Sequence, residues 1–369
     1  MRIALFSPAS RDAVQGGAES VFAALAASFA AEGHDVTRIH AGRTFHRDLA
    51  DGGPVWSVPL ERSRTWRGLA RPRSATRVPL SALRLARCLR SARPDVVNVH
   101  FVDALAAYVL ALQPLFGYRV VLTAHGSDVL RPRSEVHAAL VPRLLDRADA
   151  VIAVSGEVGD HVRSVAPSAC VSVIQNGVDL AFWSGGAGWE PTPGRIVQVG
   201  TLRAVKGQDV MLRALARLRD RLPSARLDLI GDGPARDRLQ ALADELGVAD
   251  AVTFVGRVPS DEIRERLRTA AVSALPSRSE GLPLTLLEAM AVGTPVVASA
   301  VGGIPETAGV PPCAVLVPPE DPERLASALL SVLTDSEEAQ ALADRAAERV
   351  EAFSWSRVVR ETENVLAGN

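Results

Sequence analysis

Two glutamates eight positions apart, Glu280 and Glu288, stand in the stretch PSRSEGLPLTLLEAMAVGTPVVAS at residues 276–299. On one continuous helix this spacing is little more than two turns, so we expect both carboxylates to face one ligand. Buried carboxylates without a cation are costly, so their expected partners are the hydroxyls of a ribose and a hexose. The alternative is that both glutamates only cap a helix. The expected helix start, whose free N–H groups suit an anion or a sugar hydroxyl, comprises Gly281, Leu282, Pro283 and Leu284.

A second loop, VGTLRAVKGQD at residues 199–209, places Arg203 and Lys206 three positions apart between glycines. Two cations before a helix start suit a diphosphate better than one charge would. Lys206 is also the only lysine among 41 basic residues, the others being arginine. In a chain so rich in arginine, a remaining lysine indicates a position that needs a compact ammonium group. A solvated basic loop, with the lysine there by chance, is the alternative.

Two further loops contain candidates. TAHGSDV, residues 123–129, places His125 after an expected strand, where it can donate to a substrate hydroxyl or act in acid–base catalysis. His125 could equally brace its loop, and Asp128 is interpreted as a bracing or helix-start carboxylate. SPASRDAVQGGAE, residues 7–19, has Gly16 and Gly17 before a helix, which suits a phosphate, although a plain turn is the simpler alternative.

These loops belong to two series of alternating strands and helices, which predict an α/β protein with two doubly wound parallel sheets. Ligands bind such sheets outside the carboxyl ends of the strands. The Gly- and Pro-rich stretch 176–194 predicts the boundary between domains 1–180 and 194–352, with a cleft between them. A final helix within 353–369 is expected to dock on the first domain. The expected strands are 3–6, 36–39, 96–99, 119–123, 150–154, 171–174, 196–199, 227–230, 252–255, 272–275 and 296–298. The expected helices are 19–32, 104–112, 136–147, 210–222, 235–246, 261–269, 284–291, 322–333 and 336–365.

Composition excludes several classes of protein. The chain has 369 residues, 41 basic and 42 acidic side chains and 47% apolar residues. This length supports two domains, the balanced charge argues against binding nucleic acid, and the apolar fraction argues against disorder. Three scattered cysteines indicate neither a disulfide framework nor a zinc site. With no signal peptide and no run near the ~18 apolar residues of a membrane span, we expect a cytoplasmic protein.

One segment departs from this balance, because residues 61–93 hold ten arginines against Glu61 alone. From residue 80 to 92 the arginines fall on one helical arc and apolar residues on another. Such a basic amphipathic segment suits an anionic membrane, at the inner face of the cell membrane, or an acidic acceptor. A solvated face over an ordinary core helix is the alternative. The arginines are Arg62, Arg64, Arg67, Arg71, Arg73, Arg77, Arg84, Arg87, Arg90 and Arg93.

Together these motifs resemble the retaining glycosyltransferases of family 4, the group 1 type, which have the GT-B fold of two facing Rossmann-like domains. The resemblance covers nearly the whole chain and depends on the order and spacing of its motifs rather than on any one of them. The motifs are GGAE, EGHDV, TAHGSDV, NGVD, VG with KG, GDGP, FVGRV, SEGLPLTLLEAMAVGTPVVAS, GGIPE and the terminal FSW.

The resemblance implies an N-terminal acceptor-binding domain, a C-terminal domain that binds a nucleotide sugar, and a role for each motif. Gly17 would contact the donor phosphate through its backbone, and His125 would lie against the donor sugar. Lys206 would bind the diphosphate, Glu280 the sugar hydroxyls and Glu288 the ribose. The backbone around Arg257 and Val258 would meet the base. Many members have arginine where this chain has Thr201, and Arg203 is our candidate for that second cation.

The expected reaction is transfer of a hexose from a nucleoside diphosphate sugar to an acceptor hydroxyl. Cations on the leaving diphosphate would lower the barrier. The resemblance implies retention without a metal or other cofactor, and the sequence contains no Asp-x-Asp triplet. We expect a UDP-sugar, front-face attack, and a glycan, lipid-linked intermediate or small molecule as acceptor. The alternatives are a nucleotide-sugar epimerase or hydrolase on the same fold, and a non-catalytic sugar-nucleotide-binding protein.

Overall fold

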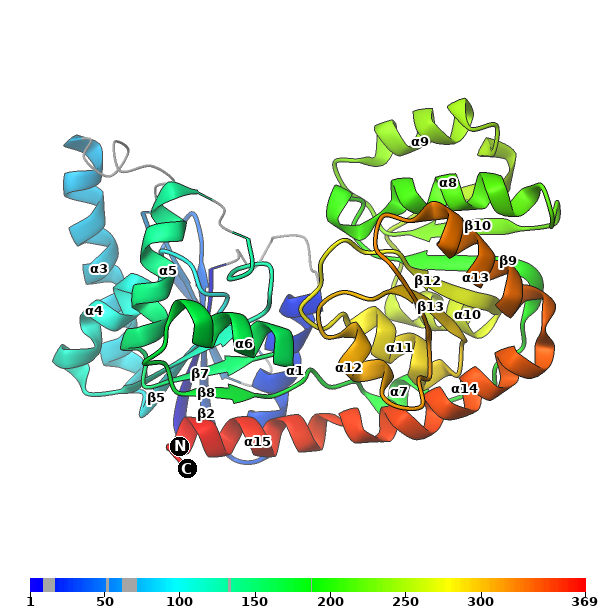
Figure 1. The fold of residues 1–369 in the computed structure, drawn as a ribbon. Coiled ribbons are helices and arrows are strands. Elements are labelled where there is room, and N and C mark those ends of the chain that lie inside the picture. Colours follow the sequence, from blue (N-terminus) through cyan, green and yellow to red (C-terminus); the bar gives the residue numbers. More distant parts are fainter. Residues whose placement is uncertain (9–16, 51–52, 62–71, 132–133, 187) are drawn as a thin grey trace. The chain divides into compact units, whose positions relative to one another are not determined.

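The computed structural model describes residues 1–369 except 9–16, 51–52, 62–71, 132–133 and 187. The described chain forms two compact units, shown in Figure 1. The first comprises Met1–Asn176 and Trp355–Asn369, and the second comprises Gly177–Ser354. Residues 177–180, which the sequence places in the first domain, therefore group with the second unit, as does the Gly- and Pro-rich stretch that follows them.

The first unit is built on an eight-stranded sheet of order β3-β4-β2-β1-β5-β6-β7-β8, parallel except for the β3–β4 pair. All five side chains of β5 are buried, as expected for a strand that helices cover on both faces. The strands are β1 (Arg2–Ser7), β2 (Asp35–Ala41), β3 (His46–Ala50), β4 (Gly53–Val58), β5 (Val96–His100), β6 (Arg119–Ala124), β7 (Ala150–Ala153) and β8 (Val171–Val173). The helices are α1 (Gly17–Ala31), α3 (Pro72–Ala92), α4 (Ala106–Phe116), α5 (Glu135–Arg147), α6 (Gly156–Val165) and α15 (Trp355–Ala367).

Two features of this unit are absent from the sequence prediction. Strands β3 and β4 form an antiparallel hairpin at the sheet edge. No side chain of β3 is fully buried, so the strand lacks the apolar alternation that predicts strands. Helix α6 contains Gly156 and Gly159, and glycine weakens a helical pattern. Edge strands and glycine-containing helices thus depend on tertiary packing that sequence periodicity does not record.

The second unit is built on a six-stranded parallel sheet of order β11-β10-β9-β12-β13-β14. Strands β9 and β12 are neighbours at its centre, so the loops that follow them start side by side. The strands are β9 (Thr192–Val199), β10 (Arg226–Ile230), β11 (Val252–Gly256), β12 (Ala270–Leu275), β13 (Val296–Ser299) and β14 (Val315–Val317). The helices are α7 (Leu180–Trp183), α8 (Gln208–Arg219), α9 (Arg236–Glu245), α10 (Ser260–Arg268), α11 (Leu284–Val292), α12 (Ile304–Ala308), α13 (Pro322–Thr334) and α14 (Ser336–Val350).

The expected helix 336–365 is interrupted. Helix α14 ends at Val350, a single 3-10 turn follows, and the backbone at Ser354 is extended before α15 begins. Phe353 is buried at this break, with 1% of its surface exposed. Helix α15 packs against α1 and against β5, β6 and β7 of the first unit. No helix among the described residues has the length and apolar composition needed to cross a membrane.

The packing of α15 yields a stability prediction. Val359 is 1% exposed, so Val359→Ala removes two buried carbon atoms and leaves a small cavity. We expect the free energy of unfolding to fall by about 2 kcal/mol, measured by urea denaturation followed by circular dichroism. The neighbouring Arg360 is exposed, and Arg360→Ala should change stability by less than about 0.5 kcal/mol. Equal effects of the two substitutions would contradict this packing.

Candidate functional site

An ion pair joins the two loops that follow the central strands of the second unit. The Lys206 Nζ donates to both carboxylate oxygens of Glu280, at 2.7 and 3.0 Å, and their side chains are 27% and 10% exposed. The Ser277 hydroxyl donates to the same carboxylate at 2.6 Å. Glu280 is therefore neutralised by a cation within the protein, a partner that the sequence analysis did not assign to it.

The two glutamates do not share one helix. Helix α11 begins at Leu284, so Glu280 lies in the preceding loop and only Glu288 lies on the helix. Pro283 occupies the N-cap position and provides no side-chain acceptor for the first N–H groups of the helix. The backbone of Glu280 lies directly against Gly302. Gly302 has a φ of +60°, and a Cβ at this position would lie 2.0 Å from the Glu280 carbonyl oxygen. The loop thus presents Glu280 beside a helix start suited to an anion or a hydroxyl.

The Lys206 loop is held by backbone contacts that only glycine permits. Gly207 has a φ of +65°, and a Cβ there would lie 1.9 Å from the carbonyl oxygen of Pro276. The Gln198 side chain donates to the Lys206 carbonyl at 2.8 Å. A turn between two glycines, resting on the neighbouring loop, therefore fixes the stem of Lys206 where its ammonium group reaches Glu280.

Arg278 is a positioning residue that the sequence analysis did not single out. Its guanidinium donates to both carboxylate oxygens of Asp209 at 2.8 Å, to Glu320 at 2.8 Å and to the Ala204 carbonyl. Hydrogen bonds from Arg278 hold the pKa of Asp209 below its usual value. Arg278 thereby links the two loops of the site. Its position two residues before Glu280 was the signal that could have identified it from the sequence.

The structure does not bring the second predicted cation, Arg203, to the Lys206–Glu280 pair. Arg203 is exposed at the start of the 3-10 turn Ala204–Lys206, and its side chain makes no hydrogen bond or ion pair with any described residue. Arg257 and Val258 follow β11 in the same unit, and Arg257 is exposed. These residues line the same carboxyl edge of the sheet as Lys206, as expected of parallel strands.

Glu288 is in a different electrostatic state from Glu280. Its carboxyl group is largely removed from water, and this desolvation raises its pKa from 4.5 to about 7. Among the described residues it has no hydrogen-bond or ion-pair partner. Hydrogen bonds from neutral hydroxyl groups stabilise a desolvated carboxyl group of this kind, and hydroxyls are the ligands that the sequence predicts for Glu288.

In the first unit, His125 lies at the end of β6 and stacks on His100. The ring nitrogens His100 Nδ1 and His125 Nε2 are 3.1 Å apart, and Phe101 packs on the His125 ring with centroids 4.7 Å apart. Asp128 accepts hydrogen bonds from the backbone N–H groups of His125 at 3.0 Å and Val102 at 2.8 Å. The bracing role predicted for Asp128 is confirmed.

The histidine pair is neutral, and its contacts assign a tautomer. Burial lowers the pKa of His125 to about 4 and that of His100 well below 6.5. The His100 Nε2 is buried without a partner, and a buried N–H without an acceptor is rarer than a bare nitrogen. His100 therefore donates from Nδ1 to His125 Nε2, which leaves the His125 Nδ1–H as the donor available to a ligand. Neutral His125 is suited to donating a hydrogen bond rather than a proton.

The remaining predicted residues are placed as follows. Gly17 is the first residue of α1, whereas Gly16 lies outside the described residues. The arginines Arg62, Arg64, Arg67 and Arg71 also lie outside them. One group of described residues, Glu32, His34 and Glu363, has metal-ligand atoms within 4.8 Å of one another. It is far in sequence from the residues above, and His34 there pairs with Glu363 at 3.1 Å.

Comparison with known proteins shows which family this chain belongs to. Residues 15–182 match the model of Glycosyltransferase Family 4, and residues 182–349 match that of Glycosyl transferases group 1. The glycogen synthase of Mycobacterium tuberculosis is 34% identical over 288 residues, which cover 75% of this chain and 69% of that protein. The chain belongs to the group 1, family 4 glycosyltransferases. A GDP-mannose-dependent alpha-(1-6)-phosphatidylinositol monomannoside mannosyltransferase of the same organism is 31% identical over 301 residues, covering 75% of this chain and 77% of that protein.

Solved structures agree on the fold of this glycosyltransferase. Sucrose-phosphate synthase from Thermosynechococcus elongatus aligns with a TM-score of 0.85 at 23% identity, covering 99% of this chain and 98% of that one. Anabaena HepE in complex with UDP-glucose aligns with a TM-score of 0.78 at 19% identity over the whole of both chains. The fold is therefore GT-B, with two Rossmann-like parallel sheets, as predicted.

The lowered pKa of His125 in the glycosyltransferase predicts a dependence of stability on pH. Between pH 4 and 6.5 the unfolded chain binds a proton at this position that the folded chain does not. Stability should therefore fall as the pH drops through this window, with about 3 kcal/mol from His125. His125→Gln should flatten the plot of unfolding free energy against pH, measured by urea denaturation.

The exposed His46 provides a matched substitution for this measurement. His46→Gln removes a histidine whose ring is exposed and lies 3.5 Å from Asp48, so it separates the effect of burial at His125 from the loss of any histidine. Parallel plots for the wild type and His125→Gln would show that His125 is not held neutral by the fold.

Proposed function

We propose that this glycosyltransferase moves a hexose from a nucleoside diphosphate sugar, with UDP as the first candidate carrier, to an acceptor hydroxyl, with retention and without a metal. The observation that carries the proposal is the Lys206–Glu280 pair at the start of α11. Both groups suit such a donor. The ammonium group of Lys206 binds the diphosphate, and the carboxylate of Glu280 accepts hydrogen bonds from the sugar hydroxyls. In the structure the two groups neutralise each other.

The chemistry proposed for the site follows from where charge develops. As the bond from the anomeric carbon to the diphosphate breaks, negative charge grows on the leaving group and positive charge on the sugar. Lys206, together with the N–H groups at the start of α11, stabilises the leaving diphosphate. We assign no nucleophile, so the acceptor hydroxyl attacks the same face that the diphosphate leaves, and a phosphate oxygen takes its proton. Neutral His125 donates a hydrogen bond to a substrate hydroxyl.

We assign further residues to the nucleoside and to the rest of the donor. Glu288, with its raised pKa and no protein partner among the described residues, accepts hydrogen bonds from the ribose hydroxyls. The backbone at Arg257 and Val258 meets the base, and Arg203 is the proposed second cation for the diphosphate. Gly17 offers backbone N–H contacts to the donor at the start of α1. The mannosyltransferase relative is named for GDP-mannose, which makes guanine the direct alternative to uracil.

A panel of donors tests this function. We expect UDP-glucose, UDP-galactose or GDP-mannose to raise the melting temperature, because a ligand at 100 times its dissociation constant adds ~2.7 kcal/mol of stability. The shift should persist in EDTA and should shrink in Glu288→Gln. Product formed with an acceptor panel of glycans, lipid-linked sugars and small alcohols should keep the donor's anomeric configuration by NMR. No shift with any member of the panel would overturn the proposed donor class.

Substitution of Lys206 tests the residue that carries the proposal. Lys206→Ala should lower kcat/KM by about 100- to 1000-fold, the usual loss for one fixed charge on a leaving oxyanion, with the far-ultraviolet spectrum of the fold retained. Lys206→Arg should recover only part of this activity, because a planar guanidinium does not match a site built for a compact ammonium group. Arg213, exposed on α8, offers a matched control, and Arg213→Ala should leave kcat/KM unchanged. Full activity of Lys206→Arg would remove the argument for a required lysine.

A further inference from the structure

Helix α3 of the first unit has an exposed face of leucine and arginine. Leu80 and Leu83 are 44% and 67% exposed, and Arg87 and Arg90 are exposed one and two turns further along. At 3.6 residues per turn these four residues fall within an arc of about 80°. The opposite face is buried in the unit and comprises Ser81, Leu85, Cys88 and Leu89. We name Leu80, Leu83, Arg84, Arg87 and Arg90 the α3 face.

The positive charge of the α3 face is not neutralised within the described chain. Helix α3 contains five arginines and no acidic residue. Arg77 lies 3.7 Å from Glu61, and Arg87 lies over the ring of Phe45. Arg84 and Arg90 have no ion-pair partner among the described residues. Exposed leucines beside exposed guanidinium groups form an amphipathic surface, which is suited to an interface between anionic head groups and acyl chains.

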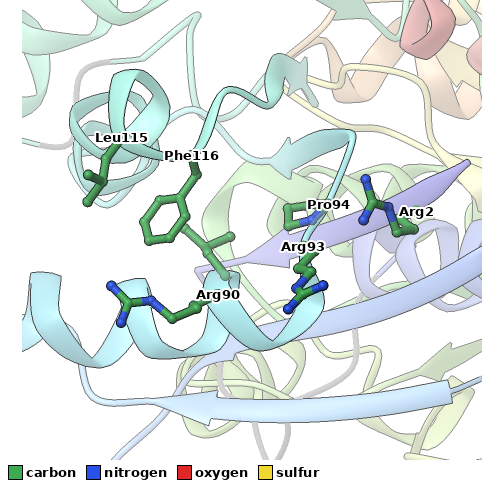
Figure 2. A pocket seen from close by; sticks show the side chains of 7 residues that line it. Arg2, Arg90, Arg93, Pro94, Leu115 and Phe116 are labelled. Carbon is green, nitrogen blue, oxygen red and sulfur yellow. The ribbon is translucent and has the colours of Figure 1, made fainter.

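The α3 face runs into a pocket at the end of the helix. The pocket has a volume of about 390 Å³ and combines the guanidinium groups of Arg90 and Arg93 with apolar walls. A third guanidinium at its edge, that of Arg2, is paired with Asp95. Figure 2 shows that Arg90 comes from α3, Arg93 and Pro94 from the turn after it, and Leu115 and Phe116 from the end of α4. Leu115 is 68% exposed at its rim. The pocket is lined by Arg2, Leu89, Arg90, Arg93, Pro94, Leu115 and Phe116.

Arg93 carries backbone strain at the edge of this pocket. Arg93 has a φ of +46°, a left-handed conformation at the end of α3 that glycine adopts at less cost. Its N–H donates to the Leu89 carbonyl at 2.8 Å, so the turn itself does not need a side chain. A side chain there costs about 1 kcal/mol, and strain of this kind is held where the side chain functions.

We propose that the α3 face and the Arg93 pocket form a docking surface for an anionic phospholipid bilayer. Leu80, Leu83 and Leu115 enter the boundary between head groups and acyl chains, the arginines of α3 lie on the lipid phosphates, and Arg90 and Arg93 bind one phosphate in the pocket. The exposed leucines favour a bilayer over a wholly polar polyanion such as nucleic acid. The proposal does not depend on the donor or on the reaction.

Co-sedimentation with vesicles tests this surface in the full chain without a donor. Vesicles of phosphatidylcholine with about one third phosphatidylglycerol should bind the protein, and vesicles of phosphatidylcholine alone should not. Each guanidinium near an anionic surface contributes about 1 kcal/mol, so replacing Arg84, Arg87 and Arg90 by glutamine should lower the partition coefficient by about 100-fold. Leu83→Ser should weaken binding and leave its dependence on salt in place.

The second unit provides a matched triple substitution. Arg213, Arg217 and Arg221 are exposed on and just after α8, and replacing them by glutamine removes the same charge from another surface. This control should bind vesicles as the wild type does. Equal losses in the two triple variants, or no preference for anionic vesicles, would overturn the proposal. Saturation by glycerol phosphate with no binding to vesicles would also overturn it, in favour of a site for a small anion.

Arg93→Gly separates a function in the pocket from a function in the fold. Glycine adopts the left-handed conformation freely, so the melting temperature should stay equal or rise while vesicle binding falls. A lower melting temperature with unchanged vesicle binding would show that Arg93 serves the fold and not the pocket.

Discussion

The candidate site of the second unit depends on one ion pair, because Lys206 and Glu280 join the loops after its two central strands. A partly buried charged pair stabilises a protein only where its geometry is nearly ideal and its other hydrogen bonds are made. The structure meets that condition with Ser277 on the carboxylate and with Gly207 and Gly302 holding the backbones in place. The fold itself therefore fixes the positions of both side chains.

The first unit uses the opposite electrostatic strategy. His125 and His100 lie buried at the strand ends and stay neutral, so this part of the molecule offers hydrogen-bond donors and acceptors rather than charge. In the reaction we propose, cations of the second unit stabilise the leaving diphosphate and neutral donors of the first unit suit sugar hydroxyls, since only the leaving group gains negative charge. Both arrangements follow from loops at the carboxyl ends of parallel strands.

Much of the fold could be predicted from the sequence, since most of the buried parallel strands are short apolar runs and the helices between them have clear periodicity. Prediction failed where burial is weak or local signals conflict, as in β3, whose side chains are largely solvated, and α6, which contains two glycines. The start of α11 at Leu284 was predicted correctly. It leaves Glu280 in the preceding loop, so the spacing of eight residues between Glu280 and Glu288 is not a spacing along one helix.

The sequence by itself determined the α/β class and the family and singled out Lys206 and Glu280, because motifs at strand ends are local and most strand ends are marked by their own apolar run. Only the tertiary structure decided how these residues are paired. Lys206 and Glu280 are 74 positions apart and meet because β9 and β12 are neighbours, which no local pattern encodes. For the same reason the sequence could not show that Arg278 binds Asp209 across the two loops, or that His100 sets the tautomer of His125.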